Sequence, residues 1–391
     1  MKFIPRKKRR RCSAALPLTK TFQSACSSTG RGFKGGLCMK RIKIAVLGIL
    51  HAHGLSNFKS ILTHSEVFEF VGLCPDYETK EEMDKGQIPA EDFRRGFAEL
   101  QKEFGKIPIL SFEELLAYPG LEAVAIESYE ADLTKYAIAA AKRGLHIFMD
   151  KPGGESVSDF ARLIALAKEQ NLVLNFGYMY RKNPAVVALL DMIKQGKIGK
   201  VTCVEAHMDC DHTDRVRAWL GNFQGGMTYF LGCHLIDLIY RIQGKPNKII
   251  PMNASTGISG VQSKDYGFAV FEYDTGPSFF KTSAAEFGGF MRRQLVVTGT
   301  EGSVEIKPLE YFKDGKMYTD MRVVTRKQNG KENWNAFGEV KTFGPIERYD
   351  VMLLPFAAQI RGEQENDYSY DYELGLFRLI AEVCGIKEEE A

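Results

Sequence analysis

The sequence lacks any run of 18 or more apolar residues, so it predicts no transmembrane helix. None of its eight cysteines forms a Cys-x-x-Cys pair, and scattered single thiols favour a reducing cytoplasm over a disulfide framework. Residues 39–391 also lack internal repeats and low-complexity tracts. The 391 residues are 45% hydrophobic and 26% charged, which is typical of a soluble globular protein with room for two domains.

Acidic residues are absent from positions 1–38, which hold ten Lys and Arg. The formal net charge of +3 minus these ten charges leaves −7 for residues 39–391, and a mildly acidic body argues against a nucleic-acid partner. We interpret the basic extension as a mis-called start, with a transit peptide or an anion-binding tail as alternatives. The folded chain is expected to begin near Met39.

Strands and helices alternate between residues 39 and 178. Apolar segments predict strands at 42–47, 67–74, 107–110, 121–126, 145–149 and 172–177. Helices are expected between them, among others at 55–62, at 131–144 and in a segment that ends at Gln170. This alternation predicts an N-terminal Rossmann-like domain, a doubly wound parallel sheet with helices on both faces.

Residues 179–391 show a different pattern, in which strands follow one another at hairpin spacing. Strands are predicted at 201–209, 248–256, 266–273, 278–286, 293–299 and 302–306, and helices at 184–195, 227–242 and 369–384. We therefore expect a C-terminal α+β domain with a large, mostly antiparallel open sheet and helices on one face.

The chain is organised around residues 146–154, where a buried strand stops abruptly. Pro152 has no N–H to continue a ladder, and Gly153 and Gly154 permit a tight turn. Asp150 and Lys151 are thus expected at the carboxyl end of a strand, where ligands bind in open α/β sheets. From spacing alone, a surface lysine is an equally good interpretation.

Five motifs in this order resemble the Gfo/Idh/MocA oxidoreductases, which include glucose–fructose oxidoreductase and inositol dehydrogenase. The motifs are Asp150-Lys151-Pro152, Gly177-Tyr-Met-Tyr-Arg-Lys-Asn-Pro184, Ile198-Gly-Lys-Val201, Gly225-Gly226 with Gly232-Cys-His234-Leu-Ile-Asp237, and Gly299-Thr-Glu-Gly-Ser303. The resemblance covers nearly all of residues 39–391, and it is the succession of the motifs that makes it specific.

Three features depart from the family pattern. The glycine-rich turn keeps only its first glycine, Gly48, while Leu50 and His53 occupy the places of the second and third. A histidine of the family falls on Leu133, and an aspartate that often precedes the catalytic histidine falls on Phe230. These departures favour, as a rival hypothesis, a non-catalytic ligand-binding or regulatory protein on the same fold.

The resemblance implies that Lys151 and His234 are catalytic. Removal of a hydride from an alcohol requires a group within hydrogen-bond reach that takes the O–H proton. Lys151 would be that group and His234 its partner, and Asp237, one turn further along the same helix, would orient His234 or contact the substrate. The alternative is a buried core histidine beside a structural aspartate.

Polar and aromatic side chains are expected to line a cleft for a polyhydroxylated substrate. The predicted substrate-binding residues are Tyr178, Arg181, His207, Asp209, Trp219 and Asp237. His207 and Asp209 share a strand face because the side-chain period of a strand is two. A divalent metal held by this part of the sequence is the lesser alternative, so no metal is predicted.

A nicotinamide dinucleotide is the expected cofactor. Asp76 follows the second strand, where an acidic residue binds the ribose hydroxyls of NAD, and no arginine beside it would accept a 2′-phosphate. NAD is therefore favoured over NADP. The predicted cofactor-binding residues are Gly48, His51, His53, Gly54, Asp76, Asp150 and Lys151.

These patterns together predict an NAD(P)-dependent oxidoreductase that transfers hydride to or from a hydroxyl of a sugar, glycoside or cyclitol. Redox-assisted glycoside elimination is a third hypothesis. We expect a cytoplasmic homodimer or homotetramer whose partner is a small carbohydrate or cyclitol, with neither nucleic acid nor membrane involved.

Overall fold

The computed structural model describes residues 40–326 and 337–387, so the basic extension at positions 1–38 lies outside the described residues. The first layer is a five-stranded parallel sheet in the order β2-β1-β3-β4-β5. Its strands are β1 (Ile42–Leu47), β2 (Phe68–Cys74), β3 (Ala123–Ile126), β4 (His146–Met149) and β5 (Leu174–Phe176). This confirms the predicted Rossmann-like sheet.

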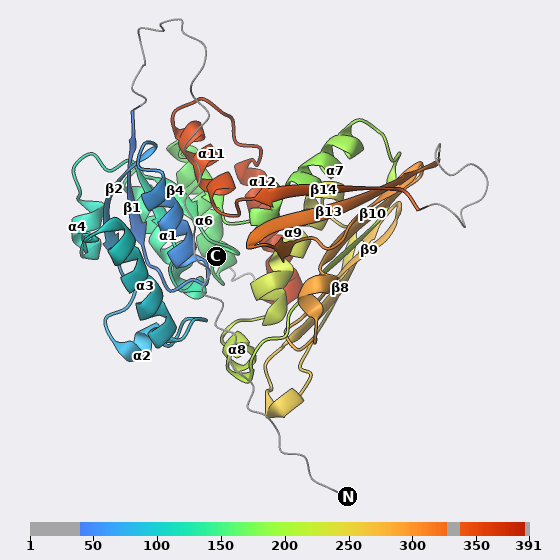
Figure 1. The fold of residues 1–391 in the computed structure, drawn as a ribbon, viewed down its shortest axis with the longest axis horizontal. Helices are drawn as coiled ribbons and strands as arrows, with labels where there is room; N and C mark the ends of the chain where they lie inside the picture. The colour runs from blue at the N-terminus through green and yellow to red at the C-terminus, as the bar shows by residue number, and fades with distance from the viewer. Residues whose placement is uncertain (1–39, 327–336, 388–391) are drawn as a thin grey trace, which may run out of the picture.

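Helices pack around this sheet and contribute buried residues to the same hydrophobic core (Figure 1). They are α1 (Gly54–Thr63), α2 (Lys80–Met83), α3 (Ala90–Phe104), α4 (Phe112–Leu116), α5 (Leu133–Lys142) and α6 (Val157–Glu169). The strand predicted at 107–110 is wrong. Ile109 forms only a single β-bridge there, with Leu73 of β2. The preceding residue, Pro108, has no N–H with which to continue a ladder.

The second layer is a nine-stranded sheet in the order β12-β13-β11-β10-β6-β9-β8-β7, with β14 paired to β13. Its strands are β6 (Val201–Asp209), β7 (Lys248–Ala254), β8 (Tyr266–Tyr273), β9 (Gly276–Ser283), β10 (Gln294–Gly299), β11 (Gly302–Ile306), β12 (Tyr311–Lys313), β13 (Lys316–Thr325) and β14 (Glu339–Ile346). The pair β6–β9 is parallel and the other pairs of this sheet in the described ranges are antiparallel. The predicted mostly antiparallel sheet is confirmed.

Helices α7 (Pro184–Lys194), α9 (Cys233–Gln243) and α12 (Tyr370–Cys384) lie between the two sheets (Figure 1). Helix α9 packs on β6 and β9, and α12 packs on both α9 and α6 of the first layer. Helix α11 (Asp350–Ile360) also returns to the first layer, where it contacts α1 and β4. The domain division at 178/179 stays a prediction. No helix in the described part of the chain is long and apolar enough to cross a bilayer.

Candidate active site

Lys151 lies buried at the carboxyl end of β4, between the two layers. Its side chain is fully buried, and its Nζ donates to the Phe230 carbonyl oxygen at 2.9 Å and lies 4.6 Å from the centre of the Phe230 ring. Gly153 and Gly154 follow with φ values of 120° and 88°, which confirms the tight turn. A buried charge in this position excludes the surface-lysine interpretation.

The carbonyl that holds Lys151 belongs to a π-helical turn, η4 (Thr228–Gly232), which leads directly into α9. π-Helical turns are rare and often occur at functional sites. Phe230 also packs against Trp219, with ring centres 5.2 Å apart. Phe230 stands where the family often has an aspartate. It therefore packs between Lys151 and Trp219.

His234 lies on the first turn of α9 and is only 2% exposed. Its ring meets Tyr178 and Tyr180 edge-on, with centres 5.8 and 5.1 Å apart, and its Nδ1 has no hydrogen-bond partner. Burial and then the charge of Lys151 lower the pKa of His234 well below its usual 6.5. The structure thus brings a neutral imidazole with a free nitrogen close to Lys151.

Arg181 and Asp237 pair with each other and with a third residue, Glu373 of α12. The Arg181 guanidinium donates to Asp237 at 2.8–3.1 Å and to Glu373 at 2.6 and 2.9 Å, and all three side chains are buried. This network joins the turn after β5 to α9 and α12, so these polar groups are engaged with one another. A substrate-binding role for either residue stays a prediction.

Tyr180 belongs to a second buried network that the sequence did not predict. Its hydroxyl donates to Glu310 Oε1 at 2.7 Å, and the same oxygen accepts from Arg293 at 2.6 Å. Arg348 pairs with the other oxygen of Glu310. Burial would raise the pKa of Glu310, but the charges of Arg348 and Arg293 outweigh it and lower the pKa. The network fixes Tyr180 against His234.

His207 and Asp209 share one face of the large sheet, where His207 is partly exposed but Asp209 is fully buried and pairs with Lys281 at 3.4 Å. Ala206 and Met208 are fully buried on the other face, and Ala206 pairs in register with Phe280, whose ring would lie 3.3 Å from a Cβ on Gly232 of the π-helical turn before α9. His207 and Asp209 alternate with these residues and therefore point away from α9. The structure does not bring them together with His234, and their substrate-binding role stays a prediction without support from proximity.

Trp219, at the end of α8 (Asp214–Trp219), links the second layer to the first. Its Nε1 donates to the Lys85 carbonyl oxygen at 2.7 Å, and Arg215 of the same helix donates to the carbonyl oxygen of Gly86 at 3.0 Å. Trp219 thus lies where the two layers meet. Its ring packs against the Phe230 ring, and Lys151 Nζ lies over that same ring.

The turn between β1 and α1 keeps the tight geometry of a dinucleotide site. Gly48 has a φ of 75°, and a Cβ there would lie 2.5 Å from Ser128 Cα. A Cβ at Gly54 would lie 2.7 Å from the Ile49 carbonyl oxygen. The first and last glycines of the turn are therefore required, and this turn at the N-terminus of α1 fits the pyrophosphate of a dinucleotide.

Asp76 holds this turn in place. One of its oxygens accepts from the Ile49 N–H at 2.9 Å and the other from the Tyr129 N–H at 2.8 Å, which joins the loops after β1 and β3. Burial raises the pKa of Asp76 to about 6 although these N–H groups oppose the shift. Each oxygen still has a second lone pair, which is free to accept from a ribose hydroxyl. Contact with the ribose stays a prediction.

His51, His53 and Asp150 meet beneath the turn. The Nδ1 atoms of both histidines lie 3.1 Å from the same oxygen of Asp150. Burial would raise the pKa of Asp150, but the two imidazoles hold it well below its ordinary value. Burial lowers the pKa of His51 to about 4. The ionised carboxylate therefore lies beside the neutral ring of His51.

Two further buried acids, Glu127 and Glu130, adjoin this cluster. Both follow β3 and are fully buried, and burial raises the pKa of Glu130 to about 8. Burial and the charge of Asp150 raise the pKa of Glu127 well above its usual range. Their position after a parallel strand was the sequence signal that could have identified them. Glu310, Arg293 and Arg348 offered no such signal, because they come from different elements that only the fold assembles.

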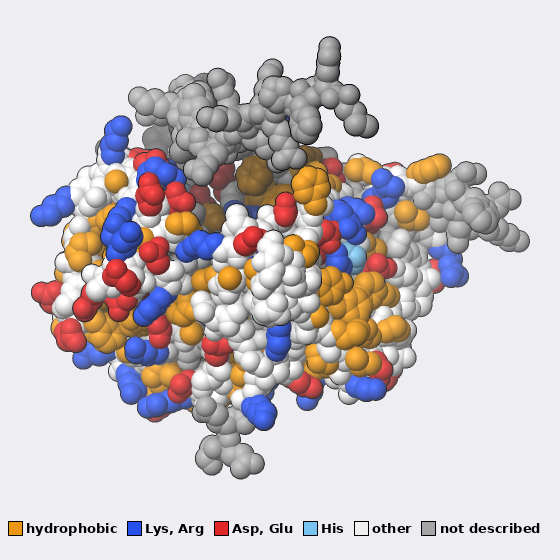
Figure 2. Space-filling view, turned by 90° about the horizontal axis from the view of Figure 1, so that it is seen from below, with side chains coloured by type: hydrophobic (Ala, Val, Ile, Leu, Met, Phe, Trp, Pro, Cys, Tyr) orange, Lys and Arg blue, Asp and Glu red, His pale blue; other side chains and the backbone are white. Residues whose placement is uncertain are grey.

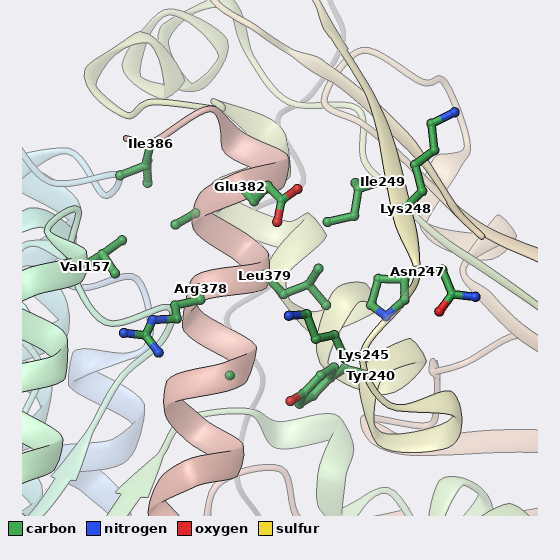
Figure 3. Close-up of a pocket in the computed structure, with 13 residues that line it drawn as sticks. Val157, Tyr240, Lys245, Asn247, Lys248, Ile249, Arg378, Leu379, Glu382 and Ile386 are labelled. Carbon is green, nitrogen blue, oxygen red and sulfur yellow. The ribbon is translucent and has the colours of Figure 1, made fainter. Parts of the chain in front are cut away.

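A separate cavity of about 630 Å³ opens between α12, the end of α9 and the start of β7 (Figure 3). Tyr240, Lys245, Arg378 and Glu382 are among its lining residues. None of the predicted site residues lines it. It is therefore distinct from the Lys151–His234 pocket.

Comparison with known proteins assigns both layers to a single class, the nicotinamide-dependent oxidoreductases. Residues 42–178 match the family described as "Oxidoreductase family, NAD-binding Rossmann fold", and residues 186–305 match the GFO/IDH/MocA C-terminal domain. The chain belongs to the Gfo/Idh/MocA oxidoreductase family. The family resemblance, the fold class and a nicotinamide cofactor, NAD or NADP, are thereby confirmed.

Several characterised proteins are similar to this chain. It is 26% identical over 229 residues to a D-xylose 1-dehydrogenase (NADP(+)) of Haloferax volcanii, covering 54% of this chain and 67% of that one. It is 24% identical over 265 residues to the 1,5-anhydro-D-fructose reductase of Ensifer adhaerens, covering 65% and 74%. It is 26% identical over 226 residues to the mouse trans-1,2-dihydrobenzene-1,2-diol dehydrogenase, covering 56% and 63%.

Solved structures show the same fold. An oxidoreductase from Desulfitobacterium hafniense superposes with a TM-score of 0.70 at 18% identity, covering 88% of this chain and 95% of that one. A 3-ketoreductase from Actinomadura kijaniata, in complex with TDP-benzene and NADP, superposes with a TM-score of 0.66 at 14% identity, covering 89% and 98%.

Proposed function

We propose that the protein transfers hydride between NAD(P) and a hydroxyl group of a sugar, glycoside or cyclitol. The observation that carries the proposal is the buried pair of Lys151 and His234 at the carboxyl edge of the Rossmann sheet. Relatives named as xylose dehydrogenase and anhydrofructose reductase act on polyhydroxylated compounds, which supports this substrate class.

Lys151 would exchange the proton of the substrate hydroxyl. A nicotinamide, when bound, supplies the hydride acceptor or donor, and the chain supplies the proton chemistry. As an alcohol becomes a carbonyl, its C–H hydride leaves and its O–H proton must pass to a nearby base. The free Nδ1 of His234 lies close to Lys151 and would accept a hydrogen bond from a second hydroxyl of the substrate.

Gly48 and Gly54 would allow the dinucleotide to approach the backbone at the N-terminus of α1, and Asp76 would keep that turn closed. Tyr178 lies edge-on to His234 and would bound the substrate. We infer that Trp219 limits entry to the pocket, since it bonds across the two layers.

The open face of the large sheet supports assembly of two or four copies. Ile250, Met252 and Val340 lie on this face in register with His207 or its neighbours and are 37%, 51% and 58% exposed. Hydrophobic side chains also gather over the sheet side of the molecule in Figure 2. The five cysteines of the described residues are free, which suits a cytoplasmic location.

Two measurements test the function. Calorimetry with NAD and NADP is expected to give saturable heat with at least one dinucleotide, and absence of heat with both at millimolar ligand would favour the non-catalytic hypothesis. Formation of NAD(P)H with a panel of pentoses, hexoses, glycosides and inositols is then expected to identify a substrate. Lack of turnover with the whole panel despite dinucleotide binding would exclude this substrate class.

A further inference from the structure

Three side chains beneath the β1–α1 turn have the composition of a metal site. His51, His53 and Asp150 each offer one atom, and these atoms lie within 4.8 Å of one another. In the described ranges, 40–326 and 337–387, this is the only group of three or more His, Cys, Asp or Glu with such spacing. Two imidazoles and one carboxylate form a ligand set that suits first-row divalent transition metals.

The distances fit an ion at the centre of the three atoms. Each histidine Nδ1 lies 3.1 Å from Asp150 Oδ2. With metal–ligand bonds of about 2.0–2.2 Å, the ligand atoms of a tetrahedral site lie roughly 3.3–3.6 Å apart. The two histidine–carboxylate distances are a few tenths of an ångström shorter than that, and all three atoms lie within 4.8 Å of one another, so small side-chain movements would open room for one ion.

The hydrogen bonds of His51 indicate which of its ring nitrogens is free to bind a metal. The His53 backbone N–H points at His51 Nδ1 from 3.2 Å, which marks Nδ1 as the unprotonated nitrogen. Nδ1 then presents a lone pair to the Asp150 oxygen across 3.1 Å, an arrangement that a cation between them would make favourable. The remaining ring proton lies on Nε2, which faces Glu130 Oε1 at 3.7 Å. Metal-bound histidines usually donate their other N–H to a carboxylate, and Glu130 faces that nitrogen, although 3.7 Å is too long for a hydrogen bond in this structure.

Unpartnered buried oxygens supply an independent observation. Glu130 is fully buried and neither of its carboxyl oxygens has a hydrogen-bond partner, and one oxygen of the buried Glu127 is also unpartnered. Such groups cost free energy unless something in the site compensates them. A divalent cation beside the ionised Asp150 would offset the charge of that carboxylate and bring a positive group next to these oxygens.

We propose that His51, His53 and Asp150 bind one first-row divalent transition metal ion, with Glu130 positioning His51. Three protein ligands leave a coordination position open, as in catalytic rather than structural sites. The ion would lie beneath the turn where we propose that the dinucleotide binds. Its positive charge would offset the Asp150 carboxylate and attract an anionic pyrophosphate. The inference goes beyond the hydride chemistry and does not depend on it.

Metal content of the full-length protein tests the proposal without any dinucleotide. The protein is stripped with a chelator, loaded with Zn²⁺ or Co²⁺, dialysed and analysed by mass spectrometry for metal per chain. We expect one ion per chain in the parent. Asp150→Asn and His53→Gln should reduce the content to background, and Glu130→Gln should weaken binding by about 10–100-fold.

His64→Gln is the matched control, because His64 also lies between two carboxylates, Glu66 and Asp350, each 3.1 Å away. It lacks a second histidine and should leave the metal content unchanged. If the Asp150 and His53 variants do not fold, X-ray absorption of the Zn²⁺-loaded parent still counts imidazole ligands. Two imidazoles support the proposal. Parental protein that retains no ion, or holds one without imidazole, overturns it and leaves the hydride chemistry to its own test.

Discussion

Lys151 is the residue on which the proposed chemistry depends most. Its Nζ is buried against Phe230, and we propose that it exchanges a proton with substrate. We predict that Lys151→Met lowers kcat by about 10²–10⁴-fold, the usual effect of losing a general acid–base group. Dinucleotide affinity, measured by calorimetry, should change far less because the turn at Gly48–Gly54 is untouched.

Lys135→Met makes the same chemical change at an exposed position of α5 and should retain parental turnover. Parental rates in Lys151→Met would rule out Lys151 as the proton-transfer group. They would not affect the assignment of the fold.

His234 should remain neutral at acid pH where an ordinary histidine would be charged. Burial lowers its pKa first, and the charge of Lys151 lowers it further, so protonation requires a pH well below 6.5. We therefore predict that log kcat/KM shows no decline near pH 6.5 that is due to His234. His234→Asn should lower the rate without changing the shape of the profile between pH 6 and 8.

His64→Asn serves as the control, since His64 pairs with Asp350 and lies apart from Lys151 and His234. This variant should keep both the parental rate and the parental pH profile. A limb near pH 6.5 that is present in the parent and disappears in His234→Asn would contradict the prediction. Such a limb would mean that the pocket is wetter and more open in turnover than in this structure.

At the scale of elements, Arg181 joins the turn after β5 to α9 and α12. Its removal would leave Asp237 and Glu373 as buried carboxylates without a counter-charge. We predict that Arg181→Met lowers the free energy of unfolding by about 3–5 kcal/mol, measured by urea denaturation. Arg241→Met, at the end of α9, offers a control that spares the carboxylates.

Arg181→Lys distinguishes a structural role from substrate binding. It keeps a charge but loses the two-pronged geometry. If Arg181 is structural, this variant loses stability while KM stays near the parental value. A large rise in KM at unchanged stability would instead favour the substrate-binding role.

The β1–α1 turn depends on the carboxylate of Asp76. Asp76→Asn keeps one acceptor oxygen but replaces the other with an amide NH2 group, which donates and cannot accept from a backbone N–H. One buried N–H then loses its partner, and we predict a loss of about 1–3 kcal/mol in the free energy of unfolding. Asp274→Asn, in an exposed turn, should cost much less, and equal losses in both variants would contradict the role of Asp76.

The elements show what the sequence can and cannot predict. Strands β1 and β6 matched because their alternation or β-branched runs are local signals. Strands β12–β14 and helix α11 were not predicted, although buried Met317, Thr319 and Met321 of β13 alternate with less buried residues, which is the local signal of a strand. Sequence period placed His207 and Asp209 on one face correctly. It could not tell which face α9 covers, because that depends on helix packing between layers.

The site follows the same division. Lys151 and His234 are 83 positions apart and came to attention through motifs, whereas their burial and proximity required the fold. The network of Tyr180, Glu310 and Arg348 had no motif at all. Long-range polar contacts of this kind leave no periodic trace in a single sequence.

At the scale of the whole molecule, Lys151 and His234 are buried, and we propose that the two layers separate before substrate enters. The bonds from α8 to the loop after α2 lie across this separation, with Trp219 bonded to Lys85 and Arg215 to Gly86. Trp219 is 6% exposed, so separation of the layers should expose its ring to water. Its fluorescence therefore reports on opening.

We predict that Arg215→Met favours the open state and increases acrylamide quenching of Trp219, recorded in a Trp334→Phe background so that one tryptophan reports. KM should rise because part of the binding energy must now close the layers, while kcat should not fall because Arg215 lies outside the Lys151 pocket. Arg95→Met, which removes an exposed arginine of α3, is the control and should leave quenching unchanged. Equal quenching in the Arg215 variant and the parent would mean that α8 does not hold the layers together, and entry to Lys151 would then have to follow another route.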